Sequence, residues 1–107
     1  MKYGLLYYRK KIGEELKPVG VIGIVNNHFY YSIKEKHSEF KDKFEHFGTT
    51  KRIFVPLKYS PNDKPTALKY YQFLRDTNIA LYKLSDLKDV KTNSPNKSIK
   101  KIFEELS

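Results

Sequence analysis

An apolar segment and an aromatic segment joined by two asparagines constrain the fold of this chain most. Val19 to Val25 is apolar on both of its alternating faces, and His28 to Ile33 is rich in aromatic residues. Asn26 and Asn27, which join them, are of the non-glycine type that best tolerates the positive φ angles of a two-residue type I′ turn. The sequence therefore predicts a β-hairpin whose first strand is central in a sheet and covered on both sides.

The length, the cysteine content and the apolar runs of the chain limit the classes of protein to which it can belong. The 107 residues suit a single domain, 1–107, with a real hydrophobic core. Without cysteine the chain has no disulfide or thiolate metal site, and its three histidines are too scattered to predict a zinc site. No apolar run is long enough to cross a membrane, and no signal-peptide pattern opens the chain. We expect a cytoplasmic protein with no membrane partner, no bound metal and no other cofactor.

The charge of the chain indicates a polyanionic partner. Lysine and arginine number 21 and aspartate and glutamate 12, which gives a formal net charge of +9. A field of this sign attracts nucleic acids, so DNA or RNA is the first partner to consider. The alternative interpretation is that the lysines only solvate the surface, as they do in many thermophilic proteins.

Periodicity predicts the elements at the two ends of the chain. Tyr3, Leu5 and Tyr7 alternate, so residues 1–15 are interpreted as containing a strand rather than a helix. Ser94-Pro95 is typical of a cap followed by a first-turn proline, and an amphipathic helix follows it to the C-terminus. That helix either docks on the sheet of its own chain or offers its apolar stripe to a partner.

After the hairpin the apolar residues change to helical spacing. Phe40, Phe44 and Phe47 recur at i, i+4 and i+7, which predicts an amphipathic helix over 34–47. His37 lies on the same apolar stripe. We interpret it as a packed, hydrogen-bonded residue at the edge of the core rather than as a ligand or a base.

The second half of the chain predicts a strand, a helix and another strand. The strands are expected at 51–59 and 79–84, with the helix at 66–75 between them. In one sheet such a βαβ unit makes its two strands parallel. The segment 85–93 is polar and is expected to be irregular. With the hairpin, these elements predict a single α/β domain with a mixed sheet of about five strands flanked by helices.

Three pairs of adjacent tyrosines occur, at 7–8, 30–31 and 70–71. Neighbouring side chains point to opposite faces of a strand or to adjacent faces of a helix. One ring of each pair is therefore expected in the core. The second ring is free to stack on a nucleic-acid base or to anchor a protein interface.

The order hairpin, helix, strand, helix, strand resembles a known nuclease core. The segment PVGVIGIVNNHFYYSIKEKHSEFKDKFEHFGTTKRIFVPL is similar to the core of the PD-(D/E)XK superfamily, the restriction-endonuclease-like fold, and the likeness covers residues 14–84. In that family Pro-Asp opens an apolar strand and Glu-x-Lys ends the returning strand. The resemblance places Pro18-Val19 at the first motif and Ser32-Ile33-Lys34 at the second, and it implies a restriction-endonuclease-like core.

The acids that bind metal in that family are missing from this chain. Val19 and Ser32 stand at the two acidic positions, and only Lys34 matches. In the family the acids hold Mg²⁺, which activates water, so the departure implies a degenerate relative without catalytic or metal-binding residues. If relocated acids restored the site, the resemblance would make Glu15, Lys34 and Glu35 the catalytic set of an active Mg²⁺-dependent nuclease.

The leading hypothesis from the sequence is a non-catalytic protein that binds the nucleic-acid backbone through a basic surface. The cations expected to contact phosphate lie at strand ends and on the polar face of the strand at 51–59: Arg9, Lys10, Lys11, Lys34, Arg52 and Lys58. The alternative is a small interaction protein of a virus or mobile element. Such a protein would bind a protein partner, or form a homodimer, through its tyrosines or its C-terminal helix.

Overall fold

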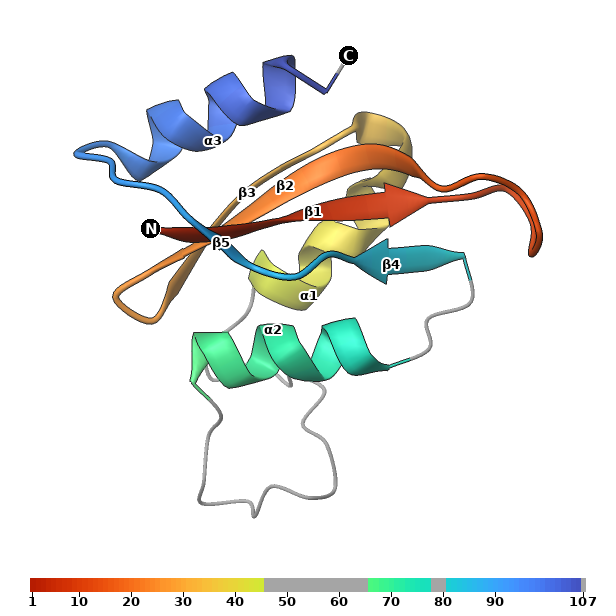
Figure 1. Ribbon diagram of the computed structural model, residues 1–107, viewed down its shortest axis with the longest axis horizontal. Coiled ribbons are helices and arrows are strands. Elements are labelled where there is room, and N and C mark those ends of the chain that lie inside the picture. Colours follow the sequence, from red (N-terminus) through yellow and green to blue (C-terminus); the bar gives the residue numbers. More distant parts are fainter. Residues whose placement is uncertain (46–65, 78–80, 107) are drawn as a thin grey trace.

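A five-stranded antiparallel sheet forms the centre of the molecule (Figure 1). The computed structural model describes residues 1–45, 66–77 and 81–106. The strands are β1 (Lys2–Tyr8), β2 (Lys17–Val25), β3 (His28–Ile33), β4 (Tyr82–Leu84) and β5 (Lys88–Asp89). β2 lies between β3 and β1, and the other edge of β1 pairs with both β4 and β5.

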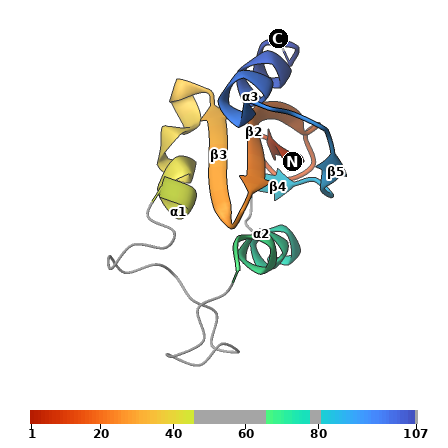
Figure 2. The same ribbon diagram turned by 90° about the vertical axis from the view of Figure 1, so that its left-hand side faces the viewer.

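Helices cover both faces of the sheet. They are the 3-10 helix η1 (Glu35–Lys41) and the α-helices α1 (Asp42–Glu45), α2 (Ala67–Asp76) and α3 (Pro95–Glu104). Figures 1 and 2 show α3 on one side of the sheet, over β2 and β3, and α2 on the other side. This arrangement confirms a small α/β fold. No helix within the described ranges is long and apolar enough to cross a lipid bilayer.

β2 is buried on both faces, and its predicted central position is confirmed. Ile22 and Ile24 face the core, whereas Gly23 faces α3, because a Cβ at that position would lie 2.7 Å from the side chain of Ile99. The core between the sheet and α1 and α2 consists of Leu6, Val19, Ile22, Ile24, Phe40, Phe44, Ala67, Tyr70, Tyr71, Leu74 and Leu84.

The hairpin turn also fixes the position of α2. Asn26 and Asn27 have φ angles of 48° and 64°, as a type I′ turn requires. The side-chain oxygen of Asn27 accepts a hydrogen bond from the backbone N of Ala67 at 2.6 Å. The first turn of α2 is therefore attached to the end of the sheet where β2 and β3 are joined.

Val19 lies on a different face of β2 from the one its spacing predicts. Strict alternation would place it on the same face as Val21, but it belongs to the core together with Ile22. The pairing of β2 with β1 skips one residue between Pro18 and Gly20. Such a bulge turns the side chain of the extra residue to the other face of the strand.

The sheet is antiparallel throughout the described residues rather than mixed. β4, expected as the second strand of a parallel βαβ unit, pairs with β1 in the antiparallel direction. The strand expected at 51–59 lies outside the described residues. The segment 85–93, expected to be irregular, contains β5. These corrections concern pairings between residues far apart in the sequence, about which local periodicity carries no information.

The helix expected at 34–47 is not regular in its described part, which ends at residue 45. It begins as η1, departs from helical angles at His37 (φ −118°, ψ 21°) and continues as α1. His37 at this kink and Phe40 after it both contact the aromatic ring of Tyr82. Phe40 thus lies in the 3-10 helix η1, whereas Phe44 lies in the α-helix α1.

β4 and β5 pair with the same edge of β1, and this pairing is interrupted at Ser85. The segment between β4 and β5 holds one residue more than the stretch of β1 that it faces. Ser85 donates from its backbone N to Leu5 O at 3.0 Å, and its Oγ accepts from Leu5 N at 2.8 Å.

Tyr71 of α2 donates from its hydroxyl to Ser85 O at 2.8 Å. Burial raises the pKa of Tyr71 to about 12, so the phenol keeps this proton. Tyr71 fits only because Gly4 has no side chain.

Replacing Gly4 with alanine is expected to destabilise the fold. The new Cβ would lie 2.8 Å from Tyr71 Cζ and closer still to its hydroxyl. We expect the free energy of unfolding, measured by urea denaturation, to fall by about 1–3 kcal/mol, the usual cost of an overpacked core. In a Tyr71→Phe background, which lacks the hydroxyl, the same substitution is expected to cost less. An equal cost in both backgrounds would contradict this contact.

Candidate nucleic-acid interface

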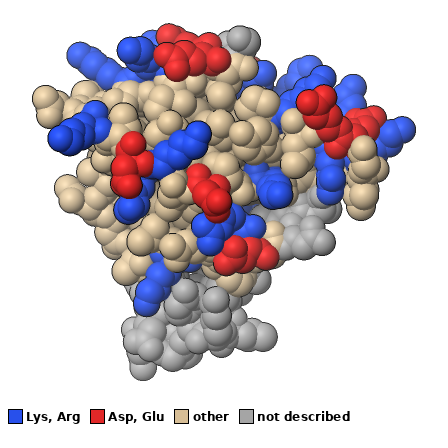
Figure 3. Space-filling model, in the orientation of Figure 1, with Lys and Arg blue, Asp and Glu red and all other residues tan. Residues whose placement is uncertain are grey.

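Basic side chains gather at the end of the sheet where β1 and β2 are joined. At this end Tyr8 pairs with Lys17, and Lys34, which follows β3, donates from its backbone N to Val19 O at 2.8 Å. Figure 3 shows Lys and Arg side chains crowded where the connection between β1 and β2 lies, with Asp and Glu side chains among them. We call this surface the basic end, and it comprises Arg9, Lys10, Lys11, Lys17, Lys34 and Lys36.

Most cations of the basic end are not neutralised by a neighbouring acid. Lys11 contacts Glu14 at 3.9 Å, and this pair is exposed. The other ion pairs found within the described residues involve Lys2 and Arg75, which are not part of the basic end. In the described part of the chain, the remaining cations of the basic end are therefore available to a phosphate without the loss of an ion pair.

Arg9 differs from the lysines around it because part of its side chain is buried. Its Nε is buried and has no hydrogen-bond partner among the residues that the structure describes. Its backbone N donates to Leu81 O at 3.0 Å, which holds the residue at the end of β1. A buried polar nitrogen without an acceptor is costly. Arg9 therefore carries a buried nitrogen whose cost is not offset by a described partner, whereas Lys10 and Lys11 beside it are exposed.

The acids of the nuclease alternative lie on different segments of the fold. Glu15 is exposed in the connection between β1 and β2, whereas Glu35 begins η1 beyond β3 and follows Lys34. Within residues 1–45, 66–77 and 81–106, no group of three or more His, Asp or Glu side chains is placed to hold a metal ion. Arg52 and Lys58, both expected to bind phosphate, lie outside the described residues.

The face of the sheet that carries α3 is only partly covered by that helix. α3 packs mainly on β2 and β3, and Figure 2 shows β1 to its side. Tyr3, Leu5 and Tyr7 of β1 point to this face, because Gly4 and Leu6 between them face the core. All three side chains are partly exposed, and none belongs to the core.

Two lysines flank these rings from the neighbouring strands. Lys83 of β4 pairs with Tyr7, and Lys88 of β5 pairs with Tyr3. Paired residues project to the same face with Cβ atoms about 4.5–5.5 Å apart. Both lysines are exposed, and neither forms an ion pair with another described residue. We call Tyr3, Leu5, Tyr7, Lys83 and Lys88 the open strip.

The lysines of the open strip were not among the residues expected from the sequence. They lie beside the two tyrosines only because β4 and β5 pair with β1, which is far from both strands in the sequence. The local signals concerned the tyrosines alone. The alternation of Tyr3, Leu5 and Tyr7 predicts a strand without saying which face is covered, and the adjacent pair at 7–8 predicts one ring outside the core.

In two of the three adjacent pairs, the two tyrosine rings lie on opposite faces of the sheet. At 7–8 and 30–31 one ring packs on the core and the other points to the side of α3. Tyr70 and Tyr71 are both buried, with 1% and 0% of their surface exposed, because α2 packs both rings toward the sheet. The expectation of a free ring is therefore wrong for this pair.

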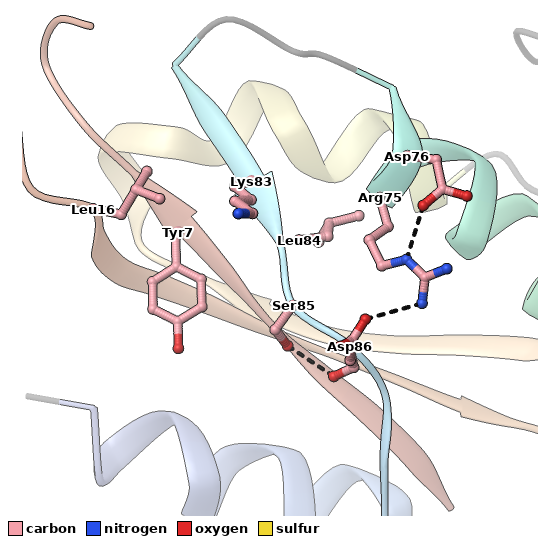
Figure 4. Close-up of a pocket in the computed structure, with 8 residues that line it drawn as sticks. All are labelled: Tyr7, Leu16, Arg75, Asp76, Lys83, Leu84, Ser85 and Asp86. Carbon is pink, nitrogen blue, oxygen red and sulfur yellow. Dashed lines mark hydrogen bonds and ion pairs between the residues drawn. The ribbon is translucent and has the colours of Figure 1, made fainter. Parts of the chain in front are cut away.

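A hollow of about 520 Å³ lies beside the open strip (Figure 4). Arg75 is bonded through Nε to Asp76 at 3.1 Å and through Nη1 to Asp86 at 3.2 Å. These acids neutralise the guanidinium, so Arg75 is not available to a phosphate without the loss of an ion pair. The lining residues are Tyr7, Leu16, Arg75, Asp76, Lys83, Leu84, Ser85 and Asp86, and two of them belong to the open strip.

His37 packs at the edge of the core, as its place on the apolar stripe predicted. Its Nδ1 lies 2.9 Å from the hydroxyl oxygen of Tyr82, and its ring centroid lies 4.3 Å from that of Tyr8. Burial lowers the pKa of His37 from 6.5, the charge of Lys36 adds to this effect, and Glu39 opposes it. The folded protein therefore favours the neutral imidazole.

A scan against protein-family models, a search of curated proteins and a search of solved structures each found no match to this chain. Function is therefore inferred from the residues and geometry described above.

The lowered pKa of His37 predicts a loss of stability in mild acid. In the unfolded chain this histidine takes up a proton near pH 6.5, whereas the folded protein resists it until a lower pH. Stability contributed by the neutral ring is thus present above the unfolded pKa and is lost as the pH falls through the folded pKa. We expect the unfolding free energy of the wild type to fall more than that of His37→Gln between about pH 7.5 and about pH 5. An NMR titration of the His37 ring with a midpoint at or above 6.5 would refute this explanation.

Proposed function

We propose that this protein is a non-catalytic nucleic-acid-binding protein that contacts the phosphate backbone through the basic end of its sheet. The observation that carries the proposal is the group of cations at this end, most of which have no acidic partner within the described residues. Phosphate contacts by unpaired lysine and arginine side chains supply most of the affinity of sequence-independent binding. The net charge of +9 favours the approach of a polyanion to this surface.

Arg9 supports the proposal more specifically than the lysines do. Its guanidinium carries a fixed charge, and because its Nε is buried, a phosphate would be met by the terminal nitrogens. Guanidinium groups match phosphate oxygens with paired hydrogen bonds, which a lysine ammonium cannot do. A phosphate held by Arg9 would lie next to Lys10 and within the same end of the sheet as Lys34.

A degenerate nuclease-like core is part of this proposal. Val19, at one of the two acidic positions implied by the resemblance, is buried in the core, and Ser32, at the other, pairs with Val21 on the face of α3. Substituting an acid at position 19 would bury a charge. The side chains at these positions suit packing rather than metal binding, which favours binding without cleavage.

Charge reversal at the basic end is expected to weaken binding and to reduce its dependence on salt. The double variant Arg9→Glu/Lys10→Glu should lower the slope of log K against log salt by roughly 1.5, because each lost phosphate contact removes about 0.7–0.9. Fluorescence anisotropy with labelled DNA and RNA, without divalent metal, measures this slope. Lys69→Glu is a control for a single charge reversal away from this end, since Lys69 lies in α2, whose first turn is attached to the opposite end of the sheet.

Two results would count against the proposal. One is an absence of binding by the wild type to every polymer at about 150 mM salt, which would mean that the charge serves only solvation. The other is an equal effect of Lys69→Glu and the double variant, which would place the contacts elsewhere.

A further inference from the structure

We propose that the open strip binds a single strand of nucleic acid, with bases stacked on Tyr3 and Tyr7 and phosphates held by Lys83 and Lys88. The proposal rests on the nucleic-acid-binding function proposed above and adds the class of polymer and the residues that contact its bases. DNA and RNA are expected to bind alike, because stacking on a ring and contact with a phosphate do not sense the 2′-hydroxyl.

The spacing of the two rings suits the first and third of three successive nucleotides. Tyr3 and Tyr7 are on one face of β1, separated by Leu5 on the same face. At about 3.3–3.4 Å per residue their Cα atoms lie about 13 Å apart along the strand, which leaves room for a base on each ring and another over Leu5. Sheet surfaces that display aromatic rings in this way stack two or three bases of a single strand.

The lysines lie where the backbone of such a strand would run. Each is the cross-strand neighbour of one ring, Lys83 of Tyr7 and Lys88 of Tyr3. A lysine stem is long enough to carry its ammonium past the edge of a base stacked on the ring, to the phosphate. The strip therefore pairs each stacking surface with one cation.

The acids near the strip are already paired with other cations. Asp89, next to Lys88, bonds to Lys2 at 3.2 Å, and Asp86 bonds to Arg75 at 3.2 Å. Their charges are thus partly offset before a ligand arrives. Lys83 and Lys88 have no such partner in the described part of the chain, so a phosphate is the complementary ligand for them.

The geometry favours a single strand over a duplex. Base pairs in a duplex stack on one another and hide their faces, so the rings of Tyr3 and Tyr7 would have nothing to stack on. α3 packs mainly on β2 and β3, and Tyr3, Leu5 and Tyr7 on the same face of β1 are partly exposed. Unpaired bases can stack on the exposed part of these side chains.

The test compares labelled oligo-dT, oligo-U and a mixed-sequence duplex by fluorescence anisotropy, with strands of about ten nucleotides, a common site size for such surfaces. Tyr3→Leu and Tyr7→Leu should each weaken single-strand binding by roughly 5- to 150-fold, as the loss of one stacked base does. Tyr3→Phe and Tyr7→Phe keep the ring and should bind nearly as the wild type does. Lys83→Gln and Lys88→Gln, at exposed positions without an ion pair to another described residue, should each lower the salt slope by about 0.7.

The outcomes separate this inference from the function on which it rests. If no polymer binds the wild type, the proposed function itself fails. If binding depends on Arg9 and Lys10 but is unchanged in the leucine and glutamine variants, or if the duplex binds better than both single strands, the open strip is not the site. If the leucine variants change only the oligomeric state seen by light scattering, the strip is a protein interface and the inference is wrong.

Discussion

The central strand β2 is apolar on both faces, and the rest of the architecture depends on covering it twice. One cover is the core layer of α1 and α2, which reaches Ile22, and the other is α3, which reaches Gly23 through Ile99. A short helix with one apolar stripe can cover only the strands directly beneath it. α3 therefore shields β2 and β3 and leaves the same face of β1 partly open. The open strip is thus a consequence of how the central strand is buried.

The interruption at Ser85 decides which residues stand beside the tyrosines of β1. If the pairing of β4 continued without the extra residue, Leu87 rather than Lys88 would face Tyr3. The extra residue lets Leu87 pack against the core and brings Lys88 to the strip. The hydrogen bonds of Ser85 with Leu5 and Tyr71 replace the regular pairing that the interruption removes. The extra residue near Ser85 thus places a cation rather than an apolar side chain beside Tyr3.

Local patterns were enough to predict most of the elements, but not how they pair. The asparagine turn, the strand at the N-terminus and α3 all follow from residues close together in the sequence. The antiparallel position of β4 depends on its contact with β1, which no local period encodes. The basic end was partly predictable, because Arg9, Lys10 and Lys11 follow one strand directly. For the open strip the sequence predicted only a free ring in the pair Tyr7-Tyr8. It did not predict the pairing with lysines, because the lysines and the tyrosines come from opposite ends of the chain.

The two surfaces would contribute differently to binding. Contacts of the basic end with phosphate release counterions, so their contribution falls steeply as salt rises. Stacking on Tyr3 and Tyr7 is apolar in origin and should depend little on salt. Acids interspersed among the cations, such as Glu14 beside Lys11, limit what the basic end can achieve alone. A ligand that contacted both surfaces would therefore combine electrostatic attraction by the basic end with stacking that persists as the salt concentration rises.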